Sequence, residues 1–330
     1  MKHVYILKTY LVLAFKIYWL NRKYTNRLFK ELNQILKTEK HSLSKDLKKR
    51  ILFYTSQCYI SASWTCALRG EVLTKKEKKN VIYLGAITPI LDDLTDSLRI
   101  TSAEILDLLK NINNGEQYEI IIAKYLYKQL QNMHNEYFNI VFEESLISQD
   151  ASILQLEERS LSENELRKIA CNKGSMSVLL YRAVLDTPLK SGEKEALISL
   201  GYALQQTNDM FDIYKDYINK QQTLFTNSKD INKNYLDYQS TISKIISQFY
   251  VLDFNKKKIE KCLIEISTIT SRGMVCLNQL LLLQGNRPDF NVANFTRKQL
   301  ICDMEKVYNI IKSLSFSVQF YKKIKTYNKK

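Results

Sequence analysis

Apolar residues recur along almost the whole chain at the three- and four-residue spacing that is typical of amphipathic helices. Gly and Pro, which most often interrupt helices and form turns, number only 8 and 3 in the 330 residues. Folds rich in sheet need turn residues about every 8–12 positions. The pattern therefore predicts an all-α protein and argues against a β-sandwich, a β-barrel and a doubly wound nucleotide-binding fold.

About ten helices are predicted from this periodicity. They lie near residues 4–36, 44–68, 78–98, 102–112, 116–146, 163–186, 192–219, 234–250, 256–284 and 296–324. No linker rich in Gly, Ser or Pro divides the chain. We therefore expect residues 1–330 to form a single domain, a large antiparallel helical bundle.

The net charge of +15 is concentrated at the two ends. Residues 1–50, which include a basic N-terminal helix region over 1–45, carry 13 Lys/Arg against 3 Asp/Glu, and the tail 321–330 carries five Lys and no acid. Residues 51–320 are neutral, whereas a nucleic-acid-binding domain usually has a basic stripe on its main fold. The ends fit a peripheral contact with an anionic membrane or solvated termini. We expect a cytoplasmic protein, peripheral to the membrane, and a monomer or homodimer.

Several common sites are missing from the sequence. No two of the six cysteines stand three positions apart, and the three histidines form no HExxH pair, so zinc and redox motifs of these types are absent. There is no Gly-x4-Gly-Lys-Ser/Thr phosphate loop and no GxGxxG. The cysteines are interpreted as small, mostly buried apolar residues in a reducing compartment.

The first candidate site is a DDxxD motif formed by Asp92, Asp93 and Asp96, after the nearly charge-free segment 81–91. On an α-helix, Asp92 and Asp96 share one face at i and i+4. Their repulsion would be relieved by Mg²⁺, which typically takes one or two carboxylates together with phosphate oxygens and water. Arg99 could contact a phosphate or neutralise the cluster. An acidic turn at a solvent-facing helix end gives the same pattern, so the motif alone is weak.

The second candidate site is a ladder of oxygen-bearing side chains. Asn208, Asp212 and Asp216 stand at i, i+4 and i+8, which predicts ligands for one Mg²⁺ along one helix face. Lys215 is expected beside the ladder, where it could bind the same anionic group as the metal. Asp209 is expected to point off this face, as an outer-sphere or surface residue.

The order of these two motifs resembles that of the class I isoprenoid synthases, the superfamily of terpene synthases and prenyltransferases. An apolar helix ends in DDxxD, and 116 positions separate Asp92 from Asn208. The second motif is similar to the NDxxSxxKE motif of terpene synthases, with Asp212 in place of Ser/Thr and Asp216 in place of Glu. The resemblance covers roughly residues 50–285.

Features of trans-prenyltransferases are also present. The pattern GxxxQxxDDxxD is similar to this chain at Gly201, Gln205, Asn208, Asp209 and Asp212. The segment Lys173-Gly174-Ser175-Met176 resembles the lysine-containing helix break of that group.

The resemblance implies a bundle of the class I terpenoid synthase type with metal on two facing walls. Asp92, Asp93 and Asp96 would bind Mg²⁺ from one wall, and Asn208, Asp212 and Asp216 from the other; three ions are implied, and Mn²⁺ is an alternative. Arg99, Lys173 and Lys215 would bind the diphosphate. A dry interior would protect the carbocation, and aromatic faces such as those of Phe211, Tyr181 and Tyr83 are candidates to stabilise it.

The implied activity is that of a Mg²⁺-dependent terpene synthase, a lyase of isoprenoid biosynthesis that ionises a C15 to C25 prenyl diphosphate. The alternative enzyme is a prenyl diphosphate-condensing enzyme, either chain-elongating or of the squalene/phytoene type. The upstream Gly-Lys-x-x-Arg element of elongating enzymes is missing, since Lys48-Lys49-Arg50 matches it poorly. No Arg-Tyr pair lies near the C-terminus, and Arg272, Arg287 and Arg297 all stay open as diphosphate sensors. The alternative of another class is a non-catalytic helical protein that binds membrane or nucleic acid.

Overall fold

The computed structural model describes residues 2–15, 22–38, 41–111, 117–133, 135–156 and 159–327. Within them the chain forms thirteen α-helices, two short 3₁₀ segments and one π-helical turn, with no strand. The prediction of an all-α protein is therefore confirmed. Contacts divide the chain into two compact units, which are described separately below. Whether these units fold together as one domain stays a prediction.

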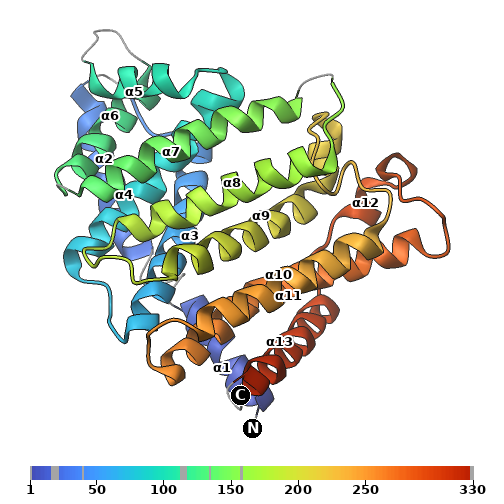
Figure 1. The fold of residues 1–330 in the computed structure, drawn as a ribbon. Coiled ribbons are helices and arrows are strands. Elements are labelled where there is room, and N and C mark those ends of the chain that lie inside the picture. Colours follow the sequence, from blue (N-terminus) through green and yellow to red (C-terminus); the bar gives the residue numbers. More distant parts are fainter. Residues whose placement is uncertain are drawn as a thin grey trace. The chain divides into compact units, whose positions relative to one another are not determined.

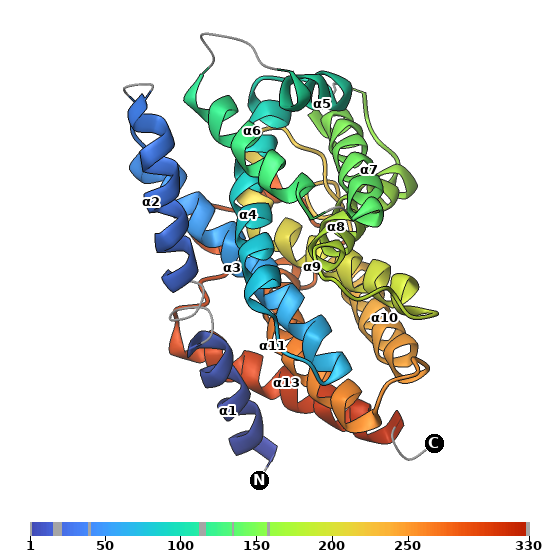
Figure 2. The ribbon, with the colours of Figure 1, turned by 90° about the vertical axis from the view of Figure 1, so that its left-hand side faces the viewer.

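One unit comprises residues 11–153 and 180–188. Its helices are α2 (Arg22–Thr38), α3 (Lys45–Arg69), α4 (Lys75–Asp92), α5 (Ser102–Lys110), α6 (Tyr118–Gln131) and α7 (Glu136–Ile153). Helices α3 and α4 pack closely along their length (Figure 2). Their backbones nearly touch at Gly85, where an added Cβ atom would lie 2.5 Å from the Cα atom of Thr55.

The other unit comprises residues 1–10, 154–179 and 189–330. It contains most of α8 (Glu163–Ala183), then α9 (Glu193–Ile218), α10 (Ile231–Tyr250), α11 (Lys256–Gln284), α12 (Arg297–Leu300) and α13 (Val307–Tyr327), together with the first part of α1 (Lys2–Phe15). Consecutive helices from α8 to α11 run antiparallel and side by side (Figure 1). Their facing apolar side chains form the core of this unit.

Two glycines set the distance between α8 and α9. A Cβ atom on Gly174 would lie 2.2 Å from the carbonyl oxygen of Gly201, and one on Gly201 would lie 2.4 Å from that of Gly174. Ser175 Oγ reinforces the crossing, because it lies 3.2 Å from the backbone oxygen of Ile198. No side chain with a Cβ atom fits at either glycine without moving a helix. The crossing therefore brings Lys173 of α8 to the face of α9 that carries Gln205.

Several predicted helices are shorter in the structure. The predicted helix over 116–146 is two helices, because α6 ends at Gln131 and α7 begins at Glu136. Asn135 caps α7 by accepting a hydrogen bond from the amide of Phe138, so the interruption needs neither Gly nor Pro. The predicted helix 4–36 contains α1 and α2, and the predicted helix 296–324 divides into α12 and α13. Residues 16–21, in the first of these, lie outside the described residues.

The predicted basic tail 321–330 is mostly helix rather than tail. Residues 321–327 are the last turns of α13, where the side chain of Ile324 is buried and Lys325 forms an ion pair with Glu260 of α11. Residues 328–330 lie outside the described residues. Removing the whole segment would therefore also remove packing from the core of the unit.

We predict that Gly174→Ala and Gly201→Ala each destabilise the protein by roughly 1–3 kcal/mol, because the added methyl group overpacks the crossing. Helix propensity alone would change stability in the opposite direction by about 1 kcal/mol. Denaturant unfolding measures the difference, with Asn172→Ala at an exposed position of α8 as the control. A Gly174→Ala variant as stable as this control would show that the close contact does not constrain the helices.

Candidate functional site

The DDxxD segment begins on α4 and continues into a π-helical turn. Helix α4 ends at Asp92, and residues Asp93–Ser97 form the π-helical turn. Pro89 lies inside the last turns of α4 and has no amide hydrogen to donate, which weakens the regular helix before the motif. The backbone between Asp92 and Asp96 is thus a π-helical turn and not the regular α-helix that was expected, while the prediction that the two side chains share one face stays a prediction. The side chain of Asp96 lies outside the described residues.

Side chains from two other helices hold the first two aspartates. Tyr54 of α3 donates a hydrogen bond of 2.5 Å to Asp92 Oδ2, and Gln149 of α7 donates one of 3.2 Å to Asp92 Oδ1. Arg50 of α3 pairs with Asp93 Oδ2 at 2.5 Å and donates to the carbonyl oxygen of Pro89 at 2.9 Å. Asp92 thus accepts hydrogen bonds from two neutral side chains, and Asp93 is paired with a guanidinium whose charge also interacts with Asp92.

The close packing of α3 on α4 explains these partners. The approach of Gly85 to Thr55 places the preceding residue, Tyr54, within reach of the end of α4. Burial and the negative charge of Asp92 raise the pKa of Tyr54, so its hydroxyl stays a donor at neutral pH. Tyr54 and Gln149 could not be predicted as partners of Asp92, because nothing in their spacing from Asp92 along the sequence indicates a contact.

The second acidic segment lies on α9. The face of α9 that is buried differs from the face that the sequence predicted. Asp209 and Asp216 are only 4% and 5% exposed, whereas Asn208 is exposed to solvent. Gln205, one turn before Asp209, donates a hydrogen bond of 2.7 Å to Asp209 Oδ1. The expectation that Asp209 points off the ladder is therefore wrong: Asp209 lies inside the cluster, and Asn208 lies at its exposed edge.

The charges of Asp209 and Asp216 are only partly balanced by nearby lysines. Burial, above all, raises the pKa of Asp209 from 3.8 to about 6 and that of Asp216 to about 7. Each is affected by the negative charge of Asp212, and Lys173 of α8 partly opposes both shifts. Lys215 is largely exposed and lies 4.0 Å from Asp212. The three aspartates therefore concentrate acidic groups at buried and half-buried positions.

The remaining predicted residues lie in different surroundings. Arg99 is exposed and adopts a left-handed backbone conformation with a φ of 54°. Tyr181 is buried and close enough to Asp92 for that charge to raise its pKa. Tyr83 is buried and donates a hydrogen bond to Glu31 at 3.0 Å, which places its hydroxyl in a polar contact with α2. Phe211 is half-buried on α9, about 100° around the helix from Asp212.

The acidic residues alone do not form a closed metal site. In the described part of the chain, no three His, Cys, Asp or Glu side chains are grouped closely enough to hold a metal ion. The oxygen-only donor set of Asp209, Asp212 and Asp216 nevertheless suits Mg²⁺, which often binds one or two carboxylates and completes its shell with phosphate oxygens and water. A metal here would need oxygens from a ligand.

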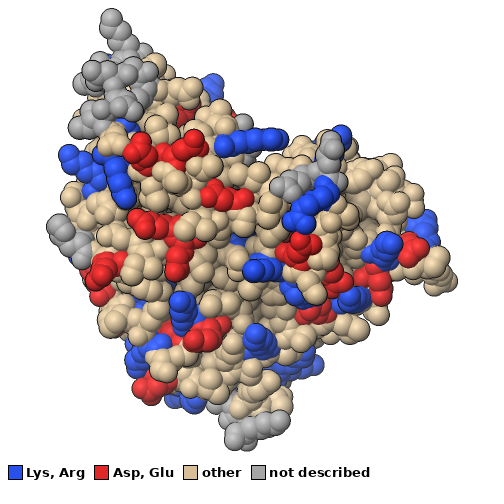
Figure 3. All heavy atoms as spheres, turned by 45° about the horizontal axis from the view of Figure 1, so that its top comes forward, with Lys and Arg blue, Asp and Glu red and all other residues tan. Residues whose placement is uncertain are grey.

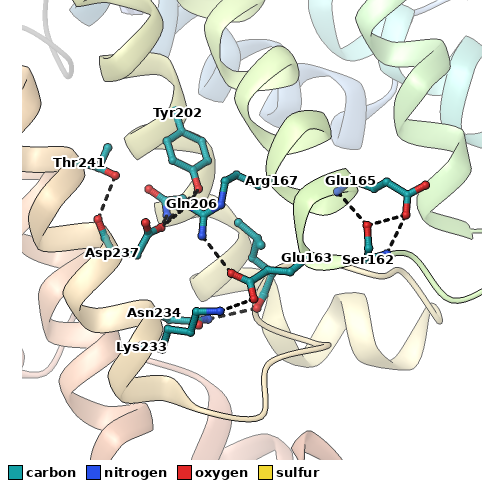
Figure 4. A network of polar contacts seen from close by, with 11 residues as sticks. Ser162, Glu163, Glu165, Arg167, Tyr202, Gln206, Lys233, Asn234, Asp237 and Thr241 are labelled. Atoms are coloured by element: carbon teal, nitrogen blue, oxygen red, sulfur yellow. Dashed lines mark hydrogen bonds and ion pairs between the residues drawn. The ribbon is translucent and has the colours of Figure 1, made fainter.

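A separate polar network joins α8, α9 and α10 beside a cavity of about 310 Å³ (Figure 4). Arg167 pairs with Asp237 at 2.7 Å and with Glu163 at 3.1 Å, and Gln206 Nε2 donates to Asp237 at 3.2 Å. Lys233 of α10 pairs with Glu163. Because these charges satisfy one another, the network holds the three helices in register rather than presenting an open binding group.

The surface charges form a mixed pattern on the face shown in Figure 3. Basic and acidic side chains alternate there, and no basic stripe crosses that face. Comparison of the chain with protein-family models, with curated proteins and with solved structures gives no match. Function is therefore argued from the two acidic segments themselves.

We predict that stability falls as the pH rises through the range in which Asp209 and Asp216 ionise. The folded state keeps their protons up to pH values of about 6 to 7, whereas the unfolded chain loses them near 3.8, so the folded state binds more protons between these values. Asp216→Asn, which imitates the protonated side chain, should flatten this dependence and raise the melting temperature near neutral pH.

Thermal unfolding without divalent metal, at a series of pH values from about 5 to about 8, measures this effect. Asp253→Asn, at a fully exposed position, is the matched control and should behave as the unmodified protein does. If the melting temperature of Asp216→Asn depended on pH in the same way as that of the unmodified protein, the raised pKa of a buried Asp216 would be contradicted.

Proposed function

We propose that the protein is a Mg²⁺-dependent enzyme of the class I isoprenoid synthase type, which ionises a prenyl diphosphate of C15 to C25 length and releases diphosphate. The proposal rests on the ordered pair of acidic motifs in the sequence and on the chemistry of their surroundings. When bound, Mg²⁺ would stabilise the negative charge that develops on the leaving diphosphate.

The observation that carries the proposal is the buried charge on α9. Asp209 and Asp216 are buried carboxylates with a raised pKa, and they lie near Asp212; Lys173 partly offsets the charge of both, and Lys215 that of Asp216. Uncompensated burial of this kind destabilises a fold, so its presence favours a site that binds cations. A divalent ion bound by these oxygens, together with a diphosphate, would offset the repulsion.

The first acidic segment is suited to a complementary role. Tyr54 and Gln149 each donate a hydrogen bond to one oxygen of Asp92 and so hold its carboxylate in place. An oriented carboxylate of this kind is a good ligand, because less side-chain freedom is lost when the metal binds. Asp93, which is already paired with Arg50, is the weaker candidate of the two.

Three cations are proposed to bind the diphosphate. Lys173 is the strongest candidate, because its charge already acts on Asp209 and Asp216. Lys215, near Asp212, and Arg99, after the π-helical turn, are exposed and free to reorient towards an anion. Preorganised positive charge at the leaving group is usually a large contribution to catalysis. Tyr181 is the aromatic candidate beside Asp92 for stabilising a cation.

A condensing enzyme is the second candidate, and one observation favours it. The hydrogen bond from Gln205 to Asp209, with Asn208 left exposed, follows the spacing of the prenyltransferase motif more closely than that of the terpene synthase motif. Under this alternative, Asp209 takes the ligand role that the sequence assigned to Asn208.

The decisive experiment is incubation of the full chain with Mg²⁺ and C10, C15, C20 and C25 prenyl diphosphates, with and without isopentenyl diphosphate. Release of diphosphate with a hydrocarbon or alcohol product, abolished by a chelator, supports a terpene synthase. Product formation only with isopentenyl diphosphate, or only from two copies of one substrate, supports a condensing enzyme. No metal-dependent turnover of any substrate would contradict both.

We predict that Asp209→Asn and Asp216→Asn each reduce kcat at least about 100-fold, because electrostatic stabilisation of the transition state is lost. These variants should fold, because the amide resembles the protonated carboxyl group. Asn208→Ala separates the two arrangements: a small effect supports Asp209 as the ligand, and a loss as large as that of Asp209→Asn supports the Asn208 ladder. Asp253→Asn is the control, and near-normal activity of all variants would show that α9 does not carry the site.

We predict that Tyr54→Phe and Gln149→Ala raise the Mg²⁺ concentration needed for half-maximal activity about 10- to 100-fold, because residues that orient a ligand affect metal affinity on this scale. A Mg²⁺ titration at saturating substrate measures the shift. Tyr59→Phe, on the same helix and with no contact to Asp92, is the control. An unchanged Mg²⁺ requirement in both variants would exclude Asp92 as a ligand that these residues position.

A further inference from the structure

Helix α1 exposes an apolar face. Val4, Leu7 and Leu11 are 69%, 47% and 63% exposed. Their spacing places them in one stripe along the helix, with Lys8 at its edge. The opposite side of α1 is attached to its unit, since Ile6 is fully buried and the hydroxyl of Tyr10 contacts Ser313 at 2.9 Å and Ser317 at 3.1 Å. An exposed apolar face on a helix that is packed against the protein on its other side indicates an interaction site.

The neighbouring helix supplies positive charge. The ring of Tyr5 on α1 lies 6.5 Å from that of Tyr321 on α13, and the next two residues of α13, Lys322 and Lys323, are exposed. Figures 1 and 2 both show α1 beside α13. Two lysines in α1 and four in α13 are accompanied by no acidic residue in either helix. The first and the last helix of the chain, both basic, thus lie side by side.

The charge of this surface selects its partner. A second copy of the chain in a symmetric contact would place the same lysine-bearing patch opposite itself, where like charges repel. An anionic lipid surface supplies the opposite charge and also accepts apolar side chains between its headgroups. Tyrosines beside lysines are typical of the layer where protein meets headgroup.

The exposed face of α1 is suited to lie on a membrane surface, and α1 is too short to span the bilayer. The apolar part of α1, Val4–Phe15, is shorter than a membrane span. Among the described helices, only α11 is long and apolar enough to cross a bilayer, and 61% of its apolar window is buried inside the protein. Helix α11 is therefore a core helix of its unit, whereas the exposed stripe of α1 is an apolar surface available to lipid.

We propose that the exposed stripe of α1 and the lysines of α13 form one docking surface for an anionic lipid membrane. The stripe inserts among the headgroups parallel to the membrane plane, and Lys8, Lys322 and Lys323 contact the lipid phosphates. This surface is independent of the acidic segments and goes beyond the proposed catalytic function.

Co-sedimentation with vesicles tests the surface, using phosphatidylcholine alone and phosphatidylcholine mixed with phosphatidylglycerol. The full chain should sediment with the mixed vesicles, and more weakly at high salt. Val4→Gln with Leu7→Gln should reduce the partition coefficient at least about tenfold through loss of apolar burial. Lys322→Glu with Lys323→Glu should reduce it by a similar factor through loss of attraction.

Two control pairs carry the same changes elsewhere at exposed positions. Leu236→Gln with Val251→Gln matches the apolar pair, and Lys168→Glu with Lys229→Glu matches the charge pair. Both should sediment as the unmodified protein does, and circular dichroism should show all variants folded. The proposal is overturned if the unmodified protein stays in the supernatant, or if the control pairs lose binding as strongly as the test pairs. It is also overturned if sedimentation velocity shows a dimer that the Val4 and Leu7 changes abolish, because the stripe would then bind a second copy.

Discussion

The contact between Gly174 and Gly201 places α8 and α9 closer together than any side chain would allow. Lys173 precedes the first glycine, and Gln205 follows the second by one helical turn, so the same crossing brings the lysine to the acidic face of α9. The polar network from Arg167 to Asp237 then attaches α10 to this pair of helices. The arrangement of Asp209, Asp212 and Asp216 therefore depends on backbone packing that involves none of the aspartates.

The two acidic segments differ in how their charge is handled. Asp92 accepts hydrogen bonds from side chains of α3 and α7, and Asp93 forms an ion pair with a side chain of α3. Asp209 and Asp216 are more deeply buried and have a raised pKa. The first segment is organised in advance, whereas the second keeps an electrostatic cost that a bound cation would relieve. This difference gives the two segments different roles in the proposed function.

The proposed membrane surface depends on how α1 is attached to its unit. Tyr10 is surrounded by the serines of α11 and α13, which holds one side of α1 and leaves the other exposed. Neither end of the chain is a free tail in the described residues, because α1 and α13 both pack on the unit. Their lysines act from a rigid surface, so membrane contact would orient the protein as well as retain it.

The helical class was predictable because periodicity and the scarcity of Gly and Pro are local properties, and local backbone preferences decide the secondary structure. The acidic segment 205–216 could also be identified as a candidate site from the sequence, since acidic residues at helical spacing are recognised without tertiary information. The inward face of α9 was not predictable: Asn208 and Asp209 are neighbours in sequence, and only the packing of α8 decides which one is buried. Likewise Tyr54 and Gln149 reach Asp92 from helices far along the chain, and contacts of that kind arise from how helices pack against one another.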